Sequence, residues 1–392
     1  MINEAKAFAQ RLGVEYHDEM LPYYGQALKL DGAVTSRMFD RERIRALNKK
    51  YNFLRYVEEE LLAAMEEIER DPDLVLLNGI LYLIIKDGKR TGGIMPVPKG
   101  GSRKLDFAPA PSVLYFVESG AALLEERGLP WEIISDSLWG LESEMLAYHD
   151  MHGRYGCRDY FDWYLYFVRG EIIRIGRLQY QFVKFTSPVR VFRREGRVTV
   201  MMDNVDMHRG GMMHGALGHT DEEGKYFADV REEGDRVTGY VADRYGEVSP
   251  EPVTLEGFDE PLKRGDNVIS IHITNGEPFT FELVEESFRQ AGEVWKKYYA
   301  DMDIKGYYGY SWVFNKHLRD ILGRDTNITR LADLFNIFPT CGGHHGIFEY
   351  VFSVPGDTPI EELPERTSMQ RGIKKYLLDG NLFLEMAGVM LL

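Results

Sequence analysis

The residues with the clearest chemical potential lie in a strand–loop–helix segment at 267–299. Apolar and polar side chains alternate along NVISIHIT at 267–274, and His272 lies two residues before a short loop that contains Gly276 and Pro278. An imidazole titrates near neutral pH and can accept a proton. A helix that starts after this loop directs free backbone N–H groups at one spot, where a phosphate or pyrophosphate can bind. The segment therefore indicates an anion position close to a candidate base.

The helix of this segment is predicted over 280–299. Its apolar residues follow a helical spacing, with Thr280 as the expected N-cap and Glu282 in the first turn. Two carboxylates, Glu277 and Glu282, lie beside the proposed anion position and would repel a phosphate. The apolar face consists of Phe281, Val284, Phe288, Ala291, Trp295 and Tyr298.

Two other clusters of reactive side chains occur in glycine-rich segments, MHRGGMMHGALGH at 207–219 and CGGHH at 341–345. Neither has the i, i+4 histidine pair or the Cys-x-x-Cys spacing that identifies a zinc site. Cys341 is a possible nucleophile, but no fixed spacing identifies its base, and no Gly-x-Ser-x-Gly elbow occurs. We interpret both segments as flexible Gly/His loops and expect no metal.

About the first 150 residues are predicted to be helical. Apolar residues recur at steps of three and four from Ile44 to Ile68, with Asp40 as the expected N-cap and Asp71-Pro72 as the expected end of this helix. Further helical runs follow at 74–86, 112–127 and 131–149.

Strands dominate after residue 160. Aromatic and β-branched residues predict strands within 161–185 and 190–202, the latter with a turn at Glu195-Gly196, and further strands near 225–231 and 236–245. The rest of the chain is predicted as strand 267–274, helix 280–299, strand 306–314, helix 315–323, strands 334–340 and 347–354, helix 367–379 and strand 381–391. This order predicts an α+β fold, with a helical domain at 1–160 and a mixed β-sheet with flanking helices at 161–392.

Composition narrows the function classes. The 392 residues carry a formal net charge of −15, which argues against a nucleic-acid partner and, more weakly, against an anionic membrane surface. Only two cysteines occur, and the N-terminal residues lack a signal-peptide pattern. The longest apolar stretch, 74–85, is too short to span a bilayer. We therefore expect a cytoplasmic protein.

Five segments carry a resemblance to a known family: GRLQYQ at 176–181, ISIHITNGEPFTFELVEESFRQA at 269–291, YSWVFNKHLRDIL at 310–322, TNITR at 326–330 and TSMQRGIKKYLLDG at 367–380. They resemble bacterial N-acyltransferases that have a helical N-terminal domain and a GNAT-like C-terminal domain. The resemblance implies that an acyl-CoA binds where strand 267–274 meets helix 280–299.

The resemblance also implies roles for individual residues. His272 becomes the candidate base, Tyr310 the candidate acid, and Ser311 a further catalytic candidate on the next strand. Acceptor-binding candidates are Arg177, Gln179 and Tyr180. The residues expected to bind the cofactor are Thr274, Asn275, Gly276, Phe279, Thr280 and Ser287.

The function implied is transfer of an acyl group from acetyl-CoA or another acyl-CoA to a small-molecule amine. The amine would attack directly in a ternary complex, with no metal. The usual pyrophosphate loop, Gln/Arg-x-x-Gly-x-Gly/Ala, is absent, and this motivates an alternative: a non-catalytic GNAT-like module that binds CoA or a related metabolite. A third hypothesis is a metal-dependent hydrolase that uses the histidine loops. The acceptor, the acyl chain length and the oligomeric state stay open.

Overall fold

The computed structural model describes residues 1–392 except 91–93, 99, 159–160 and 275–277. Its described part divides into two compact units. The first takes in Met1–Ile175 together with Thr274, and the second takes in Gly176–Ile273 and Pro278–Leu392. The predicted domain boundary between residues 160 and 161 stays a prediction.

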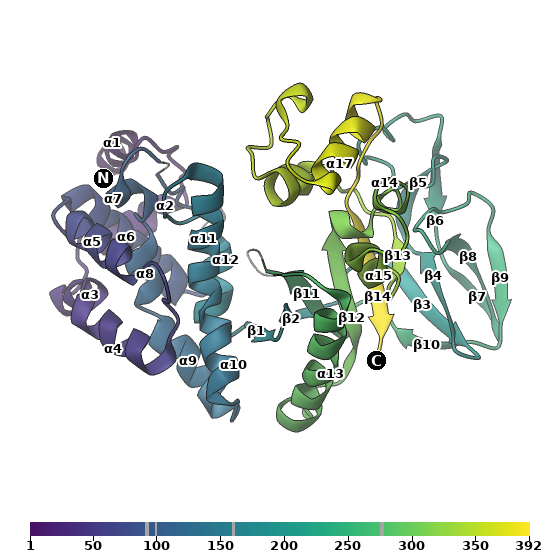
Figure 1. Ribbon diagram of the computed structural model, residues 1–392, viewed down its shortest axis with the longest axis horizontal. Coiled ribbons are helices and arrows are strands. Elements are labelled where there is room, and N and C mark those ends of the chain that lie inside the picture. Colours follow the sequence, from purple (N-terminus) through teal and green to yellow (C-terminus); the bar gives the residue numbers. More distant parts are fainter. Residues whose placement is uncertain (91–93, 99, 159–160, 275–277) are drawn as a thin grey trace. The chain divides into compact units, whose positions relative to one another are not determined.

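The first unit is helical, as predicted (Figure 1). Within the described part of the chain, no helix combines the length and the apolar character needed to cross a membrane. The elements are α1 (Ile2–Leu12), α2 (Met20–Ala27), α3 (Gly32–Met38), α4 (Arg41–Tyr51), α5 (Glu58–Glu69), α6 (Pro72–Lys86), α7 (Arg103–Asp106), α8 (Ala110–Leu114), α9 (Val117–Glu126), α10 (Trp131–Leu138), α11 (Gly140–His152), α12 (Phe161–Val168) and the short strand β1 (Ile172–Ile175).

The single helix predicted from Asp40 to Asp71 is wrong, because the chain breaks between α4 and α5. Asn52 adopts a left-handed conformation with φ 53° and ends α4. The amide of Asn48 then bonds both the N–H and the C=O of Leu54, at 2.7 and 2.8 Å, and holds the break. Asp40 caps α4 as predicted, by accepting a hydrogen bond from the N–H of Arg43 at 2.9 Å.

The strand predicted at the start of 161–185 is also wrong, because 161–168 forms α12. The buried side chains of this helix include Phe161, Tyr164, Leu165 and Val168. Their spacing of three, four and seven residues is that of one helical face. The aromatic content of this segment favoured a strand, but burial of one helical face stabilises a helix instead.

The second unit carries nearly all of the strands (Figure 1). Its strands are β2 (Leu178–Lys184), β3 (Val189–Arg194), β4 (Arg197–Met202), β5 (Val205–His208), β6 (Lys225–Ala228), β7 (Arg231–Glu233), β8 (Arg236–Ala242), β9 (Val253–Glu256), β10 (Asp259–Leu262), β11 (Asn267–Ile273), β12 (Ile304–Ser311), β13 (Asn336–Phe338) and β14 (Met386–Leu391). Its helices are α13 (Phe281–Tyr298), η1 (Trp312–Phe314), α14 (Leu318–Leu322), α15 (Asn327–Ala332), α16 (His345–Ile347), η2 (Phe348–Phe352), η3 (Ile360–Glu362) and α17 (Ser368–Leu378).

The principal sheet of this unit has the strand order β2–β11–β12–β14–β13. Strands β11 and β12 are parallel, while β2, β14 and β13 pair antiparallel with their neighbours. The sheet is therefore mixed, and the predicted α+β class is confirmed. Helix α13 connects the parallel pair, as a parallel connection requires.

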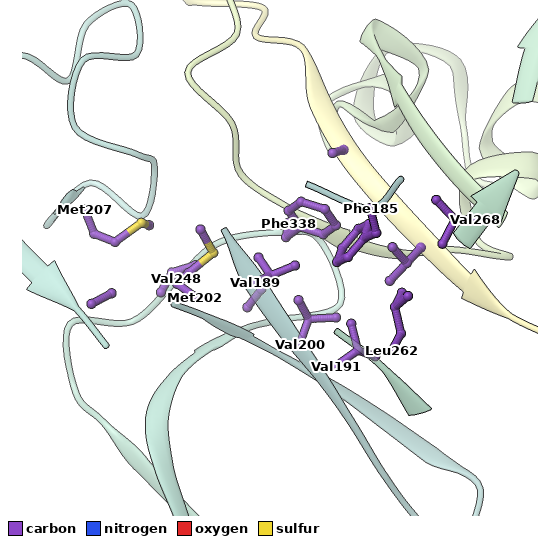
Figure 2. Close-up of a cluster of buried hydrophobic side chains, with 14 residues drawn as sticks. Phe185, Val189, Val191, Val200, Met202, Met207, Val248, Leu262, Val268 and Phe338 are labelled. Carbon is purple, nitrogen blue, oxygen red and sulfur yellow. The ribbon is translucent and has the colours of Figure 1, made fainter. Parts of the chain in front are cut away.

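A second sheet, β10–β3–β4–β8–β7 with β9 beside β8, packs on the principal sheet. Figure 2 shows the buried core, in which Val189 and Val200 of the second sheet meet Val268 and Phe338 of the first. The hairpin predicted at Glu195-Gly196 joins β3 to β4, with φ 50° and 78° at these two residues.

The strand predicted at 347–354 is wrong. Residues His345–Ile347 form α16, and Phe348–Phe352 continue as the π-helical turn η2. The buried side chains of Phe348, Val351 and Phe352 pack with Ile373 of α17. In a helix, these three side chains lie on one face and enter the core together. In a strand they would be divided between two faces.

A capping box fixes the start of α17 and yields a stability prediction. Thr367 Oγ1 accepts the N–H of Gln370 at 3.1 Å, and Gln370 Oε1 accepts the N–H of Thr367 at 3.2 Å. We expect Thr367→Ala to destabilise α17 by about 1 kcal/mol, because the N–H of Gln370 loses its acceptor. Amide hydrogen exchange in the first turn of α17 should become about fivefold faster. Thr367→Ser keeps the hydroxyl and should exchange as the wild type does; equal acceleration in both variants contradicts the prediction.

Candidate functional site

Strands β11 and β12 separate toward their C-terminal ends. Their parallel pairing runs through Asn267↔Ile304, Ile269↔Tyr307 and Ser270↔Tyr308. In the described residues it goes no further, although β11 stays paired with β2 as far as Ile273 and β12 with β14 as far as Ser311. The hydrogen-bond ladder is thus interrupted between 271–273 and 309–311. An extended ligand can supply the missing partners to such strands.

The two faces of the principal sheet have different partners. On one face, Tyr180 and Tyr307 contact α13, and Trp295 of that helix donates a hydrogen bond to Tyr307 Oη at 3.0 Å. On the other face, Val268 and Tyr308 pack toward the second sheet. Because side chains alternate along a strand, His272 and Tyr310 share this second face. Ser270 pairs with Tyr308, so the two predicted catalytic side chains lie on the two diverging ends.

His272 lies opposite Gln179 of β2, and its Nε2 is 3.3 Å from Gln181 Oε1. Burial lowers the pKa of His272 to about 4. The imidazole is therefore neutral at pH 7. Gln179, an acceptor-binding candidate on the same face, is buried, and its Nε2 finds no hydrogen-bond acceptor among the described residues.

Tyr310 and Ser311 use their hydroxyls differently. Tyr310 is 48% exposed and donates a hydrogen bond to Glu385 Oε2 at 2.9 Å. Partial burial of the phenol and the Glu385 carboxylate raise the pKa of Tyr310 well above its usual value, so the phenol is protonated at neutral pH. Ser311 Oγ accepts the N–H of Val313 at 3.2 Å and so caps the turn η1.

The N-terminus of α13 is occupied by the protein's own oxygen atoms. Thr280 Oγ1 accepts the N–H of Leu283 at 3.3 Å, which confirms the predicted N-cap. Asn327 Oδ1 accepts the N–H of Phe281 at 3.2 Å, and Asn327 Nδ2 donates to the carbonyl of Phe279 at 2.9 Å. A phosphate at this position would compete with these acceptors.

Two arginines lie near the start of α13. Arg177 Nε donates to the carbonyl of Pro278 at 3.0 Å, and its guanidinium lies 5.3 Å from the Phe279 ring centroid. Arg330 lies 3.9 Å from the Phe281 ring centroid and pairs with Glu282 at 3.3 Å. Arg330 thus places positive charge beside Glu282, whereas Glu277 lies outside the described residues.

The other predicted cofactor residues are placed only in part. Thr274 is buried, at 5% exposed. Asn275 and Gly276 lie outside the described residues. The assignment of these three residues to cofactor binding stays a prediction.

A family model, the GNAT-like C-terminal domain, matches residues 172–390. The chain belongs to the GNAT-like C-terminal domain family. The match covers more than half of the chain and takes in every predicted site residue. The resemblance seen in the sequence is thereby confirmed.

Solved acyltransferase structures share the fold of this family member. One, in complex with decanoyl-CoA and teicoplanin, superposes with a TM-score of 0.64 at 18% identity and covers 99% of both chains. A variant acyltransferase in complex with octanoyl-CoA gives the same values. Another comparison, with an acyltransferase in complex with decanoyl-CoA, gives 0.59 at 17% identity over 94% of this chain and 98% of that one. No curated protein matches the chain significantly. The likeness shows that the fold shared with these acyltransferases includes the helical region as well as the GNAT-like domain.

Tyr180 and Ser287 pair inside the core of this GNAT-like unit. Both side chains have no exposed surface, and Tyr180 Oη lies 2.7 Å from Ser287 Oγ. Ser287 Oγ also accepts the N–H of Leu178 at 3.3 Å. The fold thus separates Tyr180 from Gln179, its neighbour in the predicted acceptor site, because the two face opposite sides of the sheet. Their binding roles stay predictions.

One contact of the histidine loops is local, and another joins the two loops. His208 Nε2 lies 2.8 Å from Asp221 Oδ2, and Cys341 Sγ lies 3.6 Å from the carbonyl of His214. In the described part of the chain, no three His, Cys, Asp or Glu side chains are grouped as a metal site would require. The side chain of His345 lies outside that part.

One residue near the predicted site is not among the site residues predicted from the sequence. Glu385 lies 75 positions after Tyr310 and contacts it only because β14 pairs with β12. No motif surrounds Glu385 in the sequence. The one signal in the sequence is the glycine-rich segment CGGHHG at 341–346, but the sequence does not show that Glu385 packs against it.

The low pKa of His272 gives a pH prediction. Its pKa is about 4 in the folded protein and near 6.5 in an unfolded chain. Between these values the unfolded state binds more protons, so the free energy of unfolding falls as the pH falls from about 6.5 to 4. We expect His272→Gln to remove roughly 1–3 kcal/mol of this loss.

Urea unfolding at pH 4.5 and 7.5 measures the effect. The matched control is His149→Gln, at a side chain that is 43% exposed. An equal drop in stability for the wild type and for His272→Gln would show that burial of His272 does not set this dependence.

Proposed function

We propose that this protein is an acyltransferase that moves an acyl group from an acyl-CoA to a small-molecule amine. The observation that carries the proposal is the divergence of β11 and β12 in a chain of the GNAT-like family. The extended arm of an acyl-CoA would complete the interrupted ladder between residues 271–273 and 309–311. The thioester would then lie near the diverging ends that bear His272 and Tyr310.

The structural neighbours guide the choice of acyl donor. Two acyltransferases of this fold are complexes with decanoyl-CoA and octanoyl-CoA, and another is a complex with CoA and 10C-teicoplanin. We therefore propose a medium-chain acyl-CoA as the donor to test first, ahead of acetyl-CoA. The acceptor is proposed only as an amine-bearing small molecule.

The proposed reaction needs few protein groups. The neutral amine attacks the thioester carbon, a base removes the proton from the new ammonium nitrogen, and the thiolate leaves. Backbone N–H groups on the edges of β11 and β12 that face each other where the strands diverge are suited to stabilise the oxyanion. Tyr310, protonated at neutral pH, is suited to protonate the thiolate. Direct attack requires no covalent enzyme intermediate.

A second candidate function is a binding module without turnover. The observation in its favour is the N-terminus of α13, where Thr280 and Asn327 occupy N–H groups that a pyrophosphate would use. Such a module would bind CoA or a related metabolite and release no thiol in the presence of amines.

The test combines binding with turnover. We expect decanoyl-CoA to bind the wild type in calorimetry, and free thiol to appear when a panel of primary amines, including glucosamine, ethanolamine and benzylamine, is added. Tyr310→Phe should lower kcat by about 10²-fold or more, because the leaving thiolate loses its acid. Its Kd for decanoyl-CoA should stay within about twofold of the wild type, since no binding energy is assigned to the hydroxyl.

The control is Tyr56→Phe, at a tyrosine of the first unit that is 71% exposed. It should bind and turn over as the wild type does. Absence of binding to decanoyl-CoA, octanoyl-CoA and acetyl-CoA would exclude the acyltransferase. Binding without thiol release for any amine would favour the module.

A further inference from the structure

Three distant segments meet around the carboxylate of Glu385. Tyr310 at the end of β12 donates to Glu385 Oε2, and the glycine-rich segment 340–346 contacts Glu385 through Thr340, Gly343 and Gly346. Within the described residues, Glu385 Oε1 has no hydrogen-bond or ion-pair partner. One oxygen of the carboxylate is therefore anchored by Tyr310, and the other makes no such bond within the described residues.

Two glycines of this segment leave room for the Tyr310–Glu385 pair. A Cβ at Gly346 would collide with Glu385 Oε1, and it would lie 3.4 Å from Trp312 Cδ1. A Cβ at Gly342 would lie 2.9 Å from Tyr310 Oη. The CGGHHG segment, which the sequence left as a flexible loop, thus packs so closely against both functional groups that a Cβ at either glycine would make them shift.

Backbone and side-chain hydrogen bonds hold the same segment in place. The N–H of Glu385 donates to the carbonyl of Gly343 at 3.0 Å. Thr340 Oγ1 donates to the carbonyl of Glu385 at 2.8 Å and accepts the N–H of Gly342 at 3.0 Å. The position of Glu385 is therefore fixed from both ends of its peptide unit, as a catalytic group requires.

We infer that Glu385 is the catalytic base that accepts the proton of the attacking amine, with Tyr310 as its proton-transfer partner. The inference rests on the proposed acyltransferase function and adds to it the identity of the base. The Glu385 carboxylate can accept an N–H hydrogen bond from a neutral primary amine and then take a proton from it after attack.

The proton balance of the step closes within this pair. The amine nitrogen forms a bond to the thioester carbon and becomes a cation, and Glu385 Oε1 takes one of its protons. The carbon–sulfur bond breaks, and the phenol proton of Tyr310 passes to the CoA thiolate. The Glu385 carboxyl group then rotates to present its protonated oxygen to the Tyr310 phenolate and returns the proton to it, so that the products are an amide and CoA thiol and no redox partner is needed.

Glu385 is better placed for this role than His272. The Nε2 of His272 lies 3.3 Å from Gln181 Oε1 of the neighbouring strand β2. Glu385 instead pairs with a tyrosine that is 48% exposed, where an acceptor can approach from solvent.

The test compares Glu385→Gln with His272→Gln. The amide introduced by Glu385→Gln can still accept the hydrogen bond of Tyr310, so the fold and the Kd for decanoyl-CoA should be unchanged. We expect kcat with the best amine of the panel to fall by about 10²- to 10⁴-fold in Glu385→Gln and by much less in His272→Gln. Hydroxylamine, a nucleophile that is neutral at pH 7 and needs less base assistance, should restore most of the rate in Glu385→Gln.

Controls separate this inference from the proposed function. Glu251→Gln changes an exposed carboxylate of the same unit and should leave kcat unchanged. Gly346→Ala should lower kcat in the same direction as Glu385→Gln, because it displaces the carboxylate. Loss of rate with hydroxylamine equal to that with amines would assign Glu385 a structural role and overturn the inference.

Two further outcomes would distinguish failure of the Glu385 inference from failure of the proposed acyltransferase function. A wild type that turns over amines, with Glu385→Gln within twofold of it, leaves the acyltransferase standing and overturns Glu385 as its base. A wild type that binds decanoyl-CoA and acylates no amine overturns this inference together with the proposed catalysis.

Discussion

The parallel pairing of β11 with β12 is the constraint on which the rest of the second unit depends. Parallel neighbours need a crossover, and α13 supplies it while covering one face of the pair. Trp295 bonds Tyr307, and Ser287 bonds Tyr180, so the polar atoms of this aromatic layer are satisfied. The layer holds the two strands together near Ile269 and Ser270 and leaves their C-terminal ends free to separate.

This arrangement assigns different tasks to the two faces of the sheet. The α13 face is closed by buried aromatic side chains, which makes it a scaffold. The opposite face carries His272 and Tyr310 on the diverging ends, with Glu385 brought in by β14. Side-chain alternation therefore places the aromatic residues that stabilise the fold on one face and the proposed catalytic residues His272 and Tyr310 on the other.

Local sequence patterns predicted the strand and the helix around the site correctly, but they could not predict contacts between residues that are distant in the sequence. The alternation at 267–274 and the helical spacing at 280–299 each lie within one element, so the sequence shows them directly. Segments 161–168 and 347–354 were assigned to strands because of their aromatic content, whereas helical burial decides their structure. Tyr310 was recognised on its strand, but its partner Glu385 depends on the pairing of β12 with β14, which no local pattern encodes.

Electrostatics shape how such a protein can hold a CoA ester. At a formal net charge of −15, the chain offers no long-range attraction to a polyanion. The start of α13 adds little, because Thr280 and Asn327 already bond its first N–H groups. Nearby, Arg330 is paired with Glu282, and Arg177 is engaged by the carbonyl of Pro278. In the proposed function the pantetheine arm, hydrogen-bonded to the open edges of β11 and β12, must therefore carry more of the binding free energy than the phosphates. Affinity for decanoyl-CoA should accordingly depend only weakly on salt concentration, since few screened ion pairs contribute to it.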